Sequence, residues 1–307
     1  MTVGVEVAGL GTAVCLAISS LIAADVSRTT GVFEFTKTRM IFASFFMLPV
    51  LFIANVPLRV SAADALTLAV SSLVGIVIGD LSLIAAISKI GPKKTSIIFS
   101  SNVVIGALLE AAIYHKKTTI EATLGILLVL TGALIVVAFR GGAGAPAAGT
   151  PMNGHLNAER QNTGVALAVL AAGCQAVGTL ISTPVVTAGT SPIMATTIRF
   201  CAASLLFVIM GRTRSDDIRT DASSATVYAK IVASALVGMC GGLTLLMLAI
   251  TSGKIAISMT YASSTPLVLL LLLWLTRGER PNASSLLGAI MAVAGTALLI
   301  FEGAHQR

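Results

Sequence analysis

The sequence predicts an all-α integral membrane protein with ten transmembrane helices arranged as two inverted five-helix repeats. Three observations predict this fold: an apolar composition, hydrophobic runs of spanning length, and an internal repeat. Of the 307 residues, 56% are hydrophobic and only 11% are charged, and the mean hydropathy is +0.95. A soluble domain carries about 25% charged residues because its surface faces water. This chain is therefore expected to face lipid.

The hydrophobic runs have the length at which an α-helix crosses a hydrocarbon core, roughly 18–25 residues. Backbone polar groups cannot face lipid unpaired, so each run is predicted to be a helix packed into one bundle. The first run lacks a basic flank and is not expected to be a cleaved signal peptide. The predicted spans are Val5–Ala24, Phe33–Ala54, Leu66–Ile87, Thr95–Tyr114, Ala122–Phe139, Gly164–Pro184, Ile193–Met210, Tyr228–Ile250, Ile255–Thr276 and Ser285–Phe301.

The two halves of the chain resemble each other. VGIVIGDLSLIAAISKIGPKKTSIIFSSNVV, from residue 74, aligns with VGMCGGLTLLMLAITSGKIAISMTYASSTPL, from residue 237. The same offset pairs Gly125 with Gly288, and a slightly smaller one pairs Arg39 with Arg199. Between the halves, GGAGAPAAGTPMNGHLNAERQNTG is typical of a flexible linker. The predicted division is a first repeat (1–140), a linker (141–163) and a second repeat (164–307).

An odd number of spans in each half has a topological consequence. The second half is predicted to enter the membrane from the opposite face to the first. Duplicated halves of inverted topology are typical of secondary transporters, whose substrate site lies between the halves near the membrane midplane. The repeat therefore favours transport over other membrane functions.

Two stretches of the sequence resemble EamA-type transporters of the drug/metabolite transporter superfamily. GDLSLIAAISKIGPKKTSIIFSS resembles the family's third-to-fourth-span signature, and LWLTRGERPNASSLLGAIMAVAGTALLI resembles its signature around the last two spans. The resemblance implies export or uptake of small metabolites such as amino acids without ATP hydrolysis, and the chain has no Walker A loop. The first half departs from the second signature, with Lys116 opposite Glu279 and Val103 opposite Pro266.

Asp80 and Arg39 are ionisable residues inside predicted spans, where a charge costs several kcal/mol unless it is paired or hydrated. Each lies about eight residues, or roughly 12 Å, from the same face of the membrane. We therefore predict an ion pair between the second and third helices. It is either structural or part of the central cavity wall, where protonation of Asp80 would couple transport to an ion gradient.

Arg199 is the repeat equivalent of Arg39, but the equivalent of Asp80 is Leu243. Three alternatives follow for the guanidinium of Arg199. It pairs with Glu110 near the end of the fourth span, it reaches the membrane interface, or it binds a substrate carboxylate or phosphate.

Polar residues at equivalent positions of the fourth and ninth spans are further candidates for the substrate site. Ser101 and Ser264 belong to a residue type common at helix contacts. Asn102 and Tyr261 are costlier to bury and are better candidates for substrate hydrogen bonds, and Gln175 of the sixth span joins them. We also expect Pro266 to loosen the ninth helix near its middle, and Lys93 and Lys94 to lie at the lipid headgroups after the Gly91-Pro92 helix end.

Cysteine and histidine positions do not suggest a cofactor. The cysteines (Cys15, Cys174, Cys201, Cys240) fall inside spans without metal-ligand spacing, and the histidines (His115, His155, His305) fall outside them. We therefore expect no cofactor and no metal. The net charge of +7 follows from lysine and arginine on membrane-flanking loops, so no nucleic-acid partner is expected.

The orientation of the chain is left open by two conflicting indications. More lysines and arginines lie on the loops opposite the termini than on the termini's side, so the positive-inside rule puts both termini outside. The family resemblance implies cytoplasmic termini instead. We expect a multi-pass protein of the bacterial inner membrane, either a monomer or a homodimer.

The predicted function is a secondary transporter, an exporter, of small polar or anionic metabolites such as amino acids, working by alternating access between the two halves. Its partners are the small-molecule substrate and the lipid bilayer. An intramembrane enzyme using Asp80 is disfavoured because Val77-Ile78-Gly79-Asp80 departs from the Gly-x-Gly-Asp motif of intramembrane aspartyl proteases and no Tyr-Asp occurs. A non-transporting scaffold would not need an arginine at equivalent positions of both halves.

Overall fold

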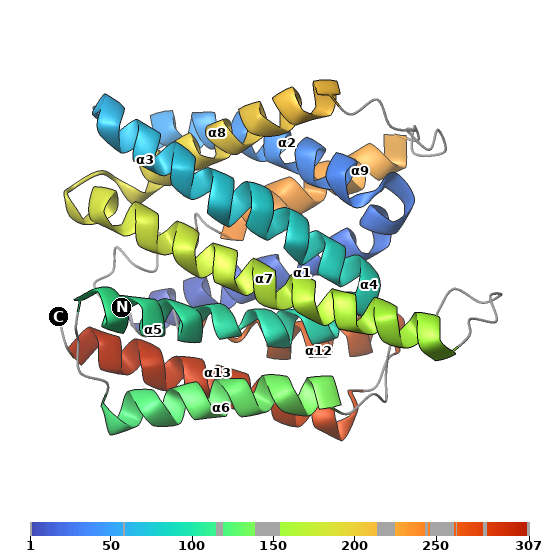
Figure 1. Ribbon diagram of the computed structural model, residues 1–307. Helices are drawn as coiled ribbons and strands as arrows, with labels where there is room; N and C mark the ends of the chain where they lie inside the picture. Colours follow the sequence, from blue (N-terminus) through green and yellow to red (C-terminus); the bar gives the residue numbers. More distant parts are fainter. Residues whose placement is uncertain are drawn as a thin grey trace.

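The protein is a bundle of α-helices (Figure 1). The computed structural model describes residues 2–57, 59–114, 119–138, 154–213, 225–242, 245, 261, 263–278 and 281–305. The helices of the first half are α1 (Thr2–Thr30), α2 (Val32–Ile53), α3 (Ala62–Ser72), the π-helix η1 (Leu73–Ile78), α4 (Gly79–Phe99), α5 (Ser101–Tyr114) and α6 (Ile120–Ala138). Those of the second half are α7 (Gly154–Thr187), α8 (Pro192–Thr213), α9 (Ala225–Ser234), the π-helix η3 (Ala235–Gly241), α12 (Thr265–Arg277) and α13 (Ala283–His305).

Six helical segments of the described chain are long and apolar enough to cross a membrane, and four shorter apolar helices accompany them. Large apolar side chains such as Phe45, Leu134, Leu205 and Leu275 are exposed on the outside of the bundle. In water this surface would be unfavourable, whereas lipid acyl chains solvate it. The start of α1 and the end of α13 lie at the same end of the bundle (Figure 1).

The structure differs in two details from what the sequence alone suggested. The helix α7 begins at Gly154 rather than at Gly164, so the second part of the predicted linker is helical. The rest of the linker lies outside the described residues. Pro266 lies in the first turn of α12 and not in the middle of a helix. In the first turn a backbone N–H has no helical partner, so proline fits there without loss.

Lys94 was expected to be exposed to the lipid headgroups, but it is buried within the protein. Gly91 has φ +79°, a left-handed conformation that favours glycine, and α4 changes direction at this residue. The turn occupies so few residues that Pro92, Lys94 and Thr95 already pack inside the protein. A longer loop would have left the lysine in contact with the membrane surface.

Close glycine contacts join α6 to α13, which lie side by side in Figure 1. A Cβ atom added to Gly132 would lie 2.7 Å from the carbonyl oxygen of Gly288. One added to Gly295 would lie 2.6 Å from the carbonyl oxygen of Gly125. In the sequence repeat, Gly125 is equivalent to Gly288 and Gly132 to Gly295, so the two contacts are related by the internal symmetry.

A second symmetric pair of contacts joins the third helix of each half to the first helix of the other. A Cβ atom on Gly79, just after η1, would lie 3.3 Å from Cβ of Cys174 in α7. One on Gly242, just after η3, would lie 3.5 Å from Cβ of Cys15 in α1. Each half therefore packs its third helix on the opposite half, and the halves interlock instead of forming two separate domains.

The close contact between α6 and α13 predicts that a single methyl group added at this contact lowers the stability of the protein. Gly132→Ala is expected to lower the melting temperature of the detergent-solubilised protein by roughly 3–10 °C, because overpacking typically costs about 1–3 kcal/mol. Gly173→Ala, in a helix of similar kind but with nothing within 4 Å of the added Cβ, serves as the control. Equal melting temperatures for the two variants would contradict the contact.

Candidate functional site

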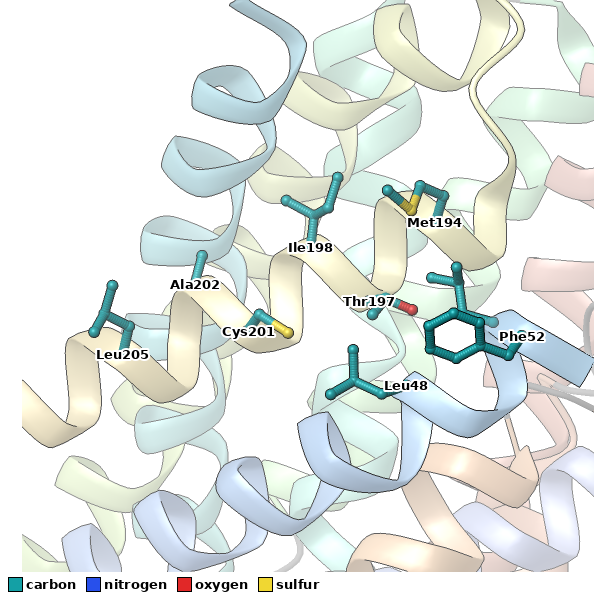
Figure 2. Close-up of a pocket in the computed structure, with 9 residues that line it drawn as sticks. Leu48, Phe52, Met194, Thr197, Ile198, Cys201, Ala202 and Leu205 are labelled. Atoms are coloured by element: carbon teal, nitrogen blue, oxygen red, sulfur yellow. The ribbon is translucent and has the colours of Figure 1, made fainter. Parts of the chain in front are cut away.

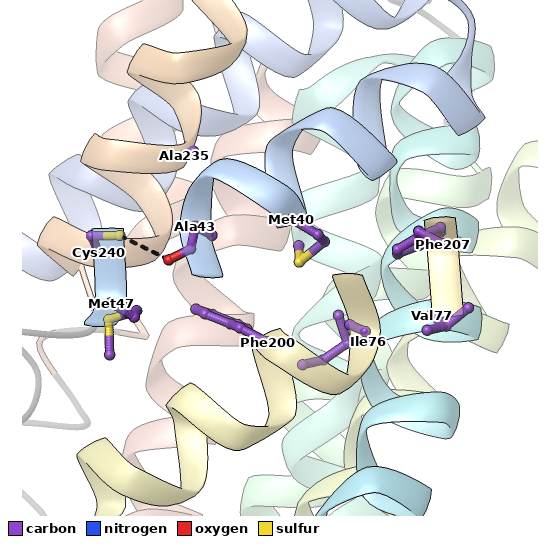
Figure 3. Close-up of a cluster of buried hydrophobic side chains, with 10 residues drawn as sticks. Met40, Ala43, Met47, Ile76, Val77, Phe200, Phe207, Ala235 and Cys240 are labelled. Carbon is purple, nitrogen blue, oxygen red and sulfur yellow. Dashed lines mark hydrogen bonds between the residues drawn. The ribbon is translucent and has the colours of Figure 1, made fainter. Parts of the chain in front are cut away.

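Four elements from both halves meet around one buried cluster, shown in Figure 3. The cluster combines side chains of α2, η1, α8 and η3, including Met40, Val77, Phe200 and Ala235. The thiol of Cys240 in η3 donates to the backbone carbonyl of Ala43 in α2 at 3.7 Å. This apolar packing fixes α2 and α8, the helices that carry the two intramembrane arginines, against the π-helical segments.

The structure brings Arg39 and Asp80 together as an ion pair between α2 and α4. The Arg39 side chain is 4% exposed and that of Asp80 is 11% exposed, so water screens the pair weakly. Arg39 also lies over the ring of Phe35, with Cζ 5.3 Å from the ring centroid. Its Nε atom is buried and has no hydrogen-bond partner. The pair therefore satisfies only part of the guanidinium.

Arg199 lies on the backbone of η1, the helical segment that precedes Asp80. Its Nη2 atom is 3.0 Å from the point where a Cβ on Gly75 would stand, so the missing side chain of Gly75 makes room for the guanidinium. The hydroxyl of Ser72 donates to the carbonyl of Arg199 at 2.6 Å and fixes this turn of α8 on η1. Within the described part of the chain, no hydrogen bond or ion pair to the guanidinium occurs, and Nε is buried without a partner.

Both arginines converge on one helical path. Gly75, beneath Arg199, and Asp80, the partner of Arg39, are five residues apart and thus roughly 8 Å apart along the helix axis. Two guanidinium groups from different helices and one carboxylate therefore contact one short helical segment. This arrangement carries a net positive charge, which attracts an anion.

The polar candidates on the predicted fourth and sixth spans differ in burial and in hydrogen bonding. Ser101 is buried and its hydroxyl donates to the carbonyl of Ile98 in the preceding turn, which is a structural role. Asn102 is half-buried, and its side chain has no hydrogen bond with the described residues. It lies one turn before Gly106, which faces Ala176 of α7 at 4.0 Å, so Asn102 is on the α7 side of α5. Gln175 is half-buried in α7.

The equivalent residues of the ninth helix lie at a break in the backbone. Tyr261 is half-buried, and its carbonyl accepts from the amide of Ser264 in the turn before α12. The hydroxyl of Thr296 in α13 donates to Oγ of Ser263, the repeat equivalent of Ser100. The side chain of Glu110 lies outside the described residues, so the predicted Arg199–Glu110 pair stays a prediction.

A cavity of about 400 Å³ opens between α2 and α8 (Figure 2). It is apolar and does not include Arg39, Asp80 or Arg199. Its lining residues are Leu48, Leu51 and Phe52 of α2 and Met194, Thr197, Ile198, Cys201, Ala202 and Leu205 of α8. It is therefore distinct from the charged region. Among the described residues, no cluster of three or more His, Cys, Asp or Glu side chains fits a metal ion.

Sequence reasoning missed the two π-helical segments. They occupy equivalent places in the repeat, η1 at Leu73–Ile78 and η3 at Ala235–Gly241, each shortly before a Gly that packs on the other half. A π-helix has no hydrophobic period that a sequence would reveal at this length. A usable signal existed in the pairing of Gly75 with Gly238, because a repeated glycine indicates close backbone approach.

Comparison with known proteins identifies the family. The model of the EamA-like transporter family matches residues 4–138 and 162–301. The chain belongs to the EamA-like transporter family. A solved structure described only as the crystal structure of a protein is similar at a TM-score of 0.61 and 14% sequence identity, covering 97% of each chain. This likeness concerns the fold alone. No curated protein sequence matches significantly.

Membership in the EamA-like family makes this chain a multi-pass membrane transporter of the drug/metabolite type. The family model matches twice, and the two matches correspond to the two repeats seen in the sequence. The arginines therefore occupy equivalent positions of two EamA units, Arg39 in the first and Arg199 in the second. The charged region is built where these two units interlock.

The ion pair predicts that a single substitution destabilises the protein much more than substitution of both residues. Asp80→Asn leaves the buried Arg39 without a charged partner, which typically costs about 3–5 kcal/mol and would lower the melting temperature by roughly 10 °C. The double variant Arg39→Met/Asp80→Leu removes both charges and is expected to recover most of this loss. Differential scanning fluorimetry in detergent measures both effects.

The control for this series is Asp64→Asn, which removes a carboxylate from the exposed first turn of α3, where Asp64 bonds Ser61. Its effect is expected to stay within about 1 kcal/mol. A double variant as unstable as Asp80→Asn would show that the two residues do not act as a pair.

Proposed function

We propose that this EamA-family protein is a secondary transporter that exports small polar or anionic metabolites, such as amino acids, across the bacterial inner membrane. In this proposal the helices form ten spans, and access alternates between two pseudo-symmetric halves. The observation that carries the proposal is the side chain of Arg199, which is half-buried beside η1, has its Nε atom fully buried, and lacks a hydrogen-bond or ion-pair partner among the described residues.

A buried guanidinium without a partner destabilises a resting protein. A carboxylate or phosphate of a substrate satisfies it, because these groups match the fork of nitrogen donors on arginine and form two charge-assisted hydrogen bonds. Substrate binding then supplies the hydrogen bonds and the negative charge that the guanidinium lacks in the empty site, and this stabilises the complex. An unpaired arginine is therefore a sensible contact for an anionic or zwitterionic substrate and an unfavourable one for a cationic drug.

The neighbouring Arg39–Asp80 pair supplies a means of coupling. Asp80 neutralises Arg39 while it is ionised, and a proton on Asp80 removes that neutralisation. Arg39 would then present a second guanidinium, at Asp80, five residues along the helical path from the point where Arg199 contacts Gly75. Proton binding at Asp80 and anion binding at the arginines would thus favour each other, which is the relation that coupled transport of a proton and an anion requires.

Asn102, Gln175 and Tyr261 complete the proposed site. Each is half-buried and carries a side chain that both donates and accepts hydrogen bonds. Such groups recognise the polar remainder of a metabolite once its acidic group is held by arginine. Ser101 lies at the helix break next to Asn102, and Ser264 lies at the break after Tyr261. In this proposal the two serines position Asn102 and Tyr261.

A ligand panel on two arginine variants tests the proposal. Purified wild type, Arg199→Gln and the exposed control Arg28→Gln are melted with amino acids, organic acids, nucleosides and cationic drugs. An acidic or zwitterionic compound is expected to stabilise wild type and Arg28→Gln, while Arg199→Gln loses at least about tenfold in affinity, since a charged hydrogen bond contributes about 1.5–3 kcal/mol. A ligand that stabilises all three proteins equally would rule Arg199 out as the substrate contact.

The compound found in this way is then used for flux measurements. Proteoliposomes containing wild type are expected to release it faster than empty vesicles, and Arg199→Gln vesicles to release it at the background rate. Binding without flux by the wild type would contradict transport and favour a receptor or scaffold.

A further inference from the structure

Lys94 carries a buried ammonium group that has no partner among the residues that the structure describes. The residue is 4% exposed, and its Nζ atom forms no hydrogen bond. Among the described residues, the other buried side-chain atoms without a partner are Ser27 Oγ, Arg39 Nε and Arg199 Nε. Ser27 is neutral and Arg39 keeps an ion pair through another nitrogen, whereas the whole charge of Lys94 is unsatisfied. An unpaired ammonium away from water destabilises a fold strongly, so a bound counter-charge is expected.

The protein side chains around Lys94 do not supply that counter-charge. Ile97 and Ile98, three and four residues later on the same side of the helix, pack into two apolar clusters. The clusters bring in Leu270 of α12 and Ala168 of α7. Aliphatic groups cannot neutralise an ammonium, and an occupant of this place must therefore carry the negative charge itself.

Three of the four described charged residues that flank this turn of the chain are also positive. Lys93 is adjacent in sequence, and Lys89 is exposed at the end of the preceding helical segment. Arg160 of α7 approaches the same turn, where its Nη2 donates to the carbonyl of Ser88 at 3.2 Å. Glu159 is exposed and forms no ion pair with Lys94. This end of the bundle therefore attracts anions.

Lys94 also extends the series of cations along one helical path. Arg199 lies on Gly75, Arg39 binds Asp80, and Lys94 follows the reversal at Gly91. At about 1.5 Å per residue, Gly91 is roughly 16 Å beyond Asp80. A positive group thus stands in the central region and another at the basic end of the bundle.

We propose that Nζ of Lys94 binds an anionic oxygen group, a carboxylate or a phosphate, at the basic end of the bundle. The group comes either from a soluble anion on the transport pathway or from the headgroup of an anionic lipid. The first source rests on the proposed function, and the second does not.

Melting of three proteins in nanodiscs tests this site: wild type, Lys94→Met, and Lys93→Met as a control that removes the same charge one residue away. Each is measured in phosphatidylcholine discs with potassium chloride, phosphate or glutamate at equal ionic strength, and in discs that also contain phosphatidylglycerol. Phosphate, glutamate or phosphatidylglycerol is expected to raise the melting temperature of wild type and Lys93→Met and to leave that of Lys94→Met unchanged.

In chloride and neutral lipid, Lys94→Met is expected to melt about 2 °C or more above wild type, because an apolar side chain of similar length replaces an unpaired buried charge. A shift with soluble anions identifies the pathway as the source, and a shift with phosphatidylglycerol identifies the lipid. Equal shifts in all three proteins, or a Lys94→Met protein less stable than wild type in chloride, would overturn the proposal. Lys94→Gln, neutral and polar, replaces Lys94→Met if that variant does not fold.

Arg199→Gln, added to the same series, separates this site from the central one. A stabilisation that needs Lys94 and persists in Arg199→Gln supports the Lys94 site even where the proposed transport function fails. A stabilisation lost only in Arg199→Gln supports the central site and counts against Lys94.

Discussion

Close contact between backbones holds this bundle together. Lipid is as apolar as leucine, so no hydrophobic force presses helices against one another inside a membrane, and packing must supply the attraction. The glycine contacts of α6 with α13 and the contacts of Gly79 and Gly242 bring helix axes close enough for that packing. Because these contacts cross from one half to the other, they also fix where the charged residues of each half lie.

The continuous helical path from α3 through η1 to α4 is fixed in place by contacts with the other half of the chain. It is held on one side by α7, at Gly79 and Cys174, and on another by the hydroxyl of Ser72, which binds the backbone of α8. Two arginines from different halves thereby reach the same helix. The contact point of Arg199, Gly75, lies within the π-helical segment η1, and Asp80 follows that segment by two residues. Segments of this kind are frequent at functional sites because they interrupt the regular hydrogen-bond ladder.

The sequence was sufficient to predict the features that depend on chemistry and periodicity. Hydrophobic run length predicted the six helical segments that are long and apolar enough to cross a membrane, and equal depth predicted that Arg39 and Asp80 meet. Features that depend on tertiary packing were out of reach. The burial of Lys94 follows from a reversal confined to Gly91, and the room for Arg199 follows from the position of Gly75 beneath it. Neither is visible without knowing which helices touch.

The internal symmetry of the chain is broken where it would cancel the charge of the site. Arg39 and Arg199 are equivalent, but Asp80 is matched in sequence by Leu243. Two symmetric ion pairs would give a neutral and closed interior, stable and without affinity for anions. With leucine at that position of the sequence, the guanidinium of Arg199 has no carboxylate partner among the described residues. The fold loses stability, and the region gains a positive charge that a substrate anion can neutralise. In the proposed function, this single unmatched position is what makes the repeated fold able to bind an anion.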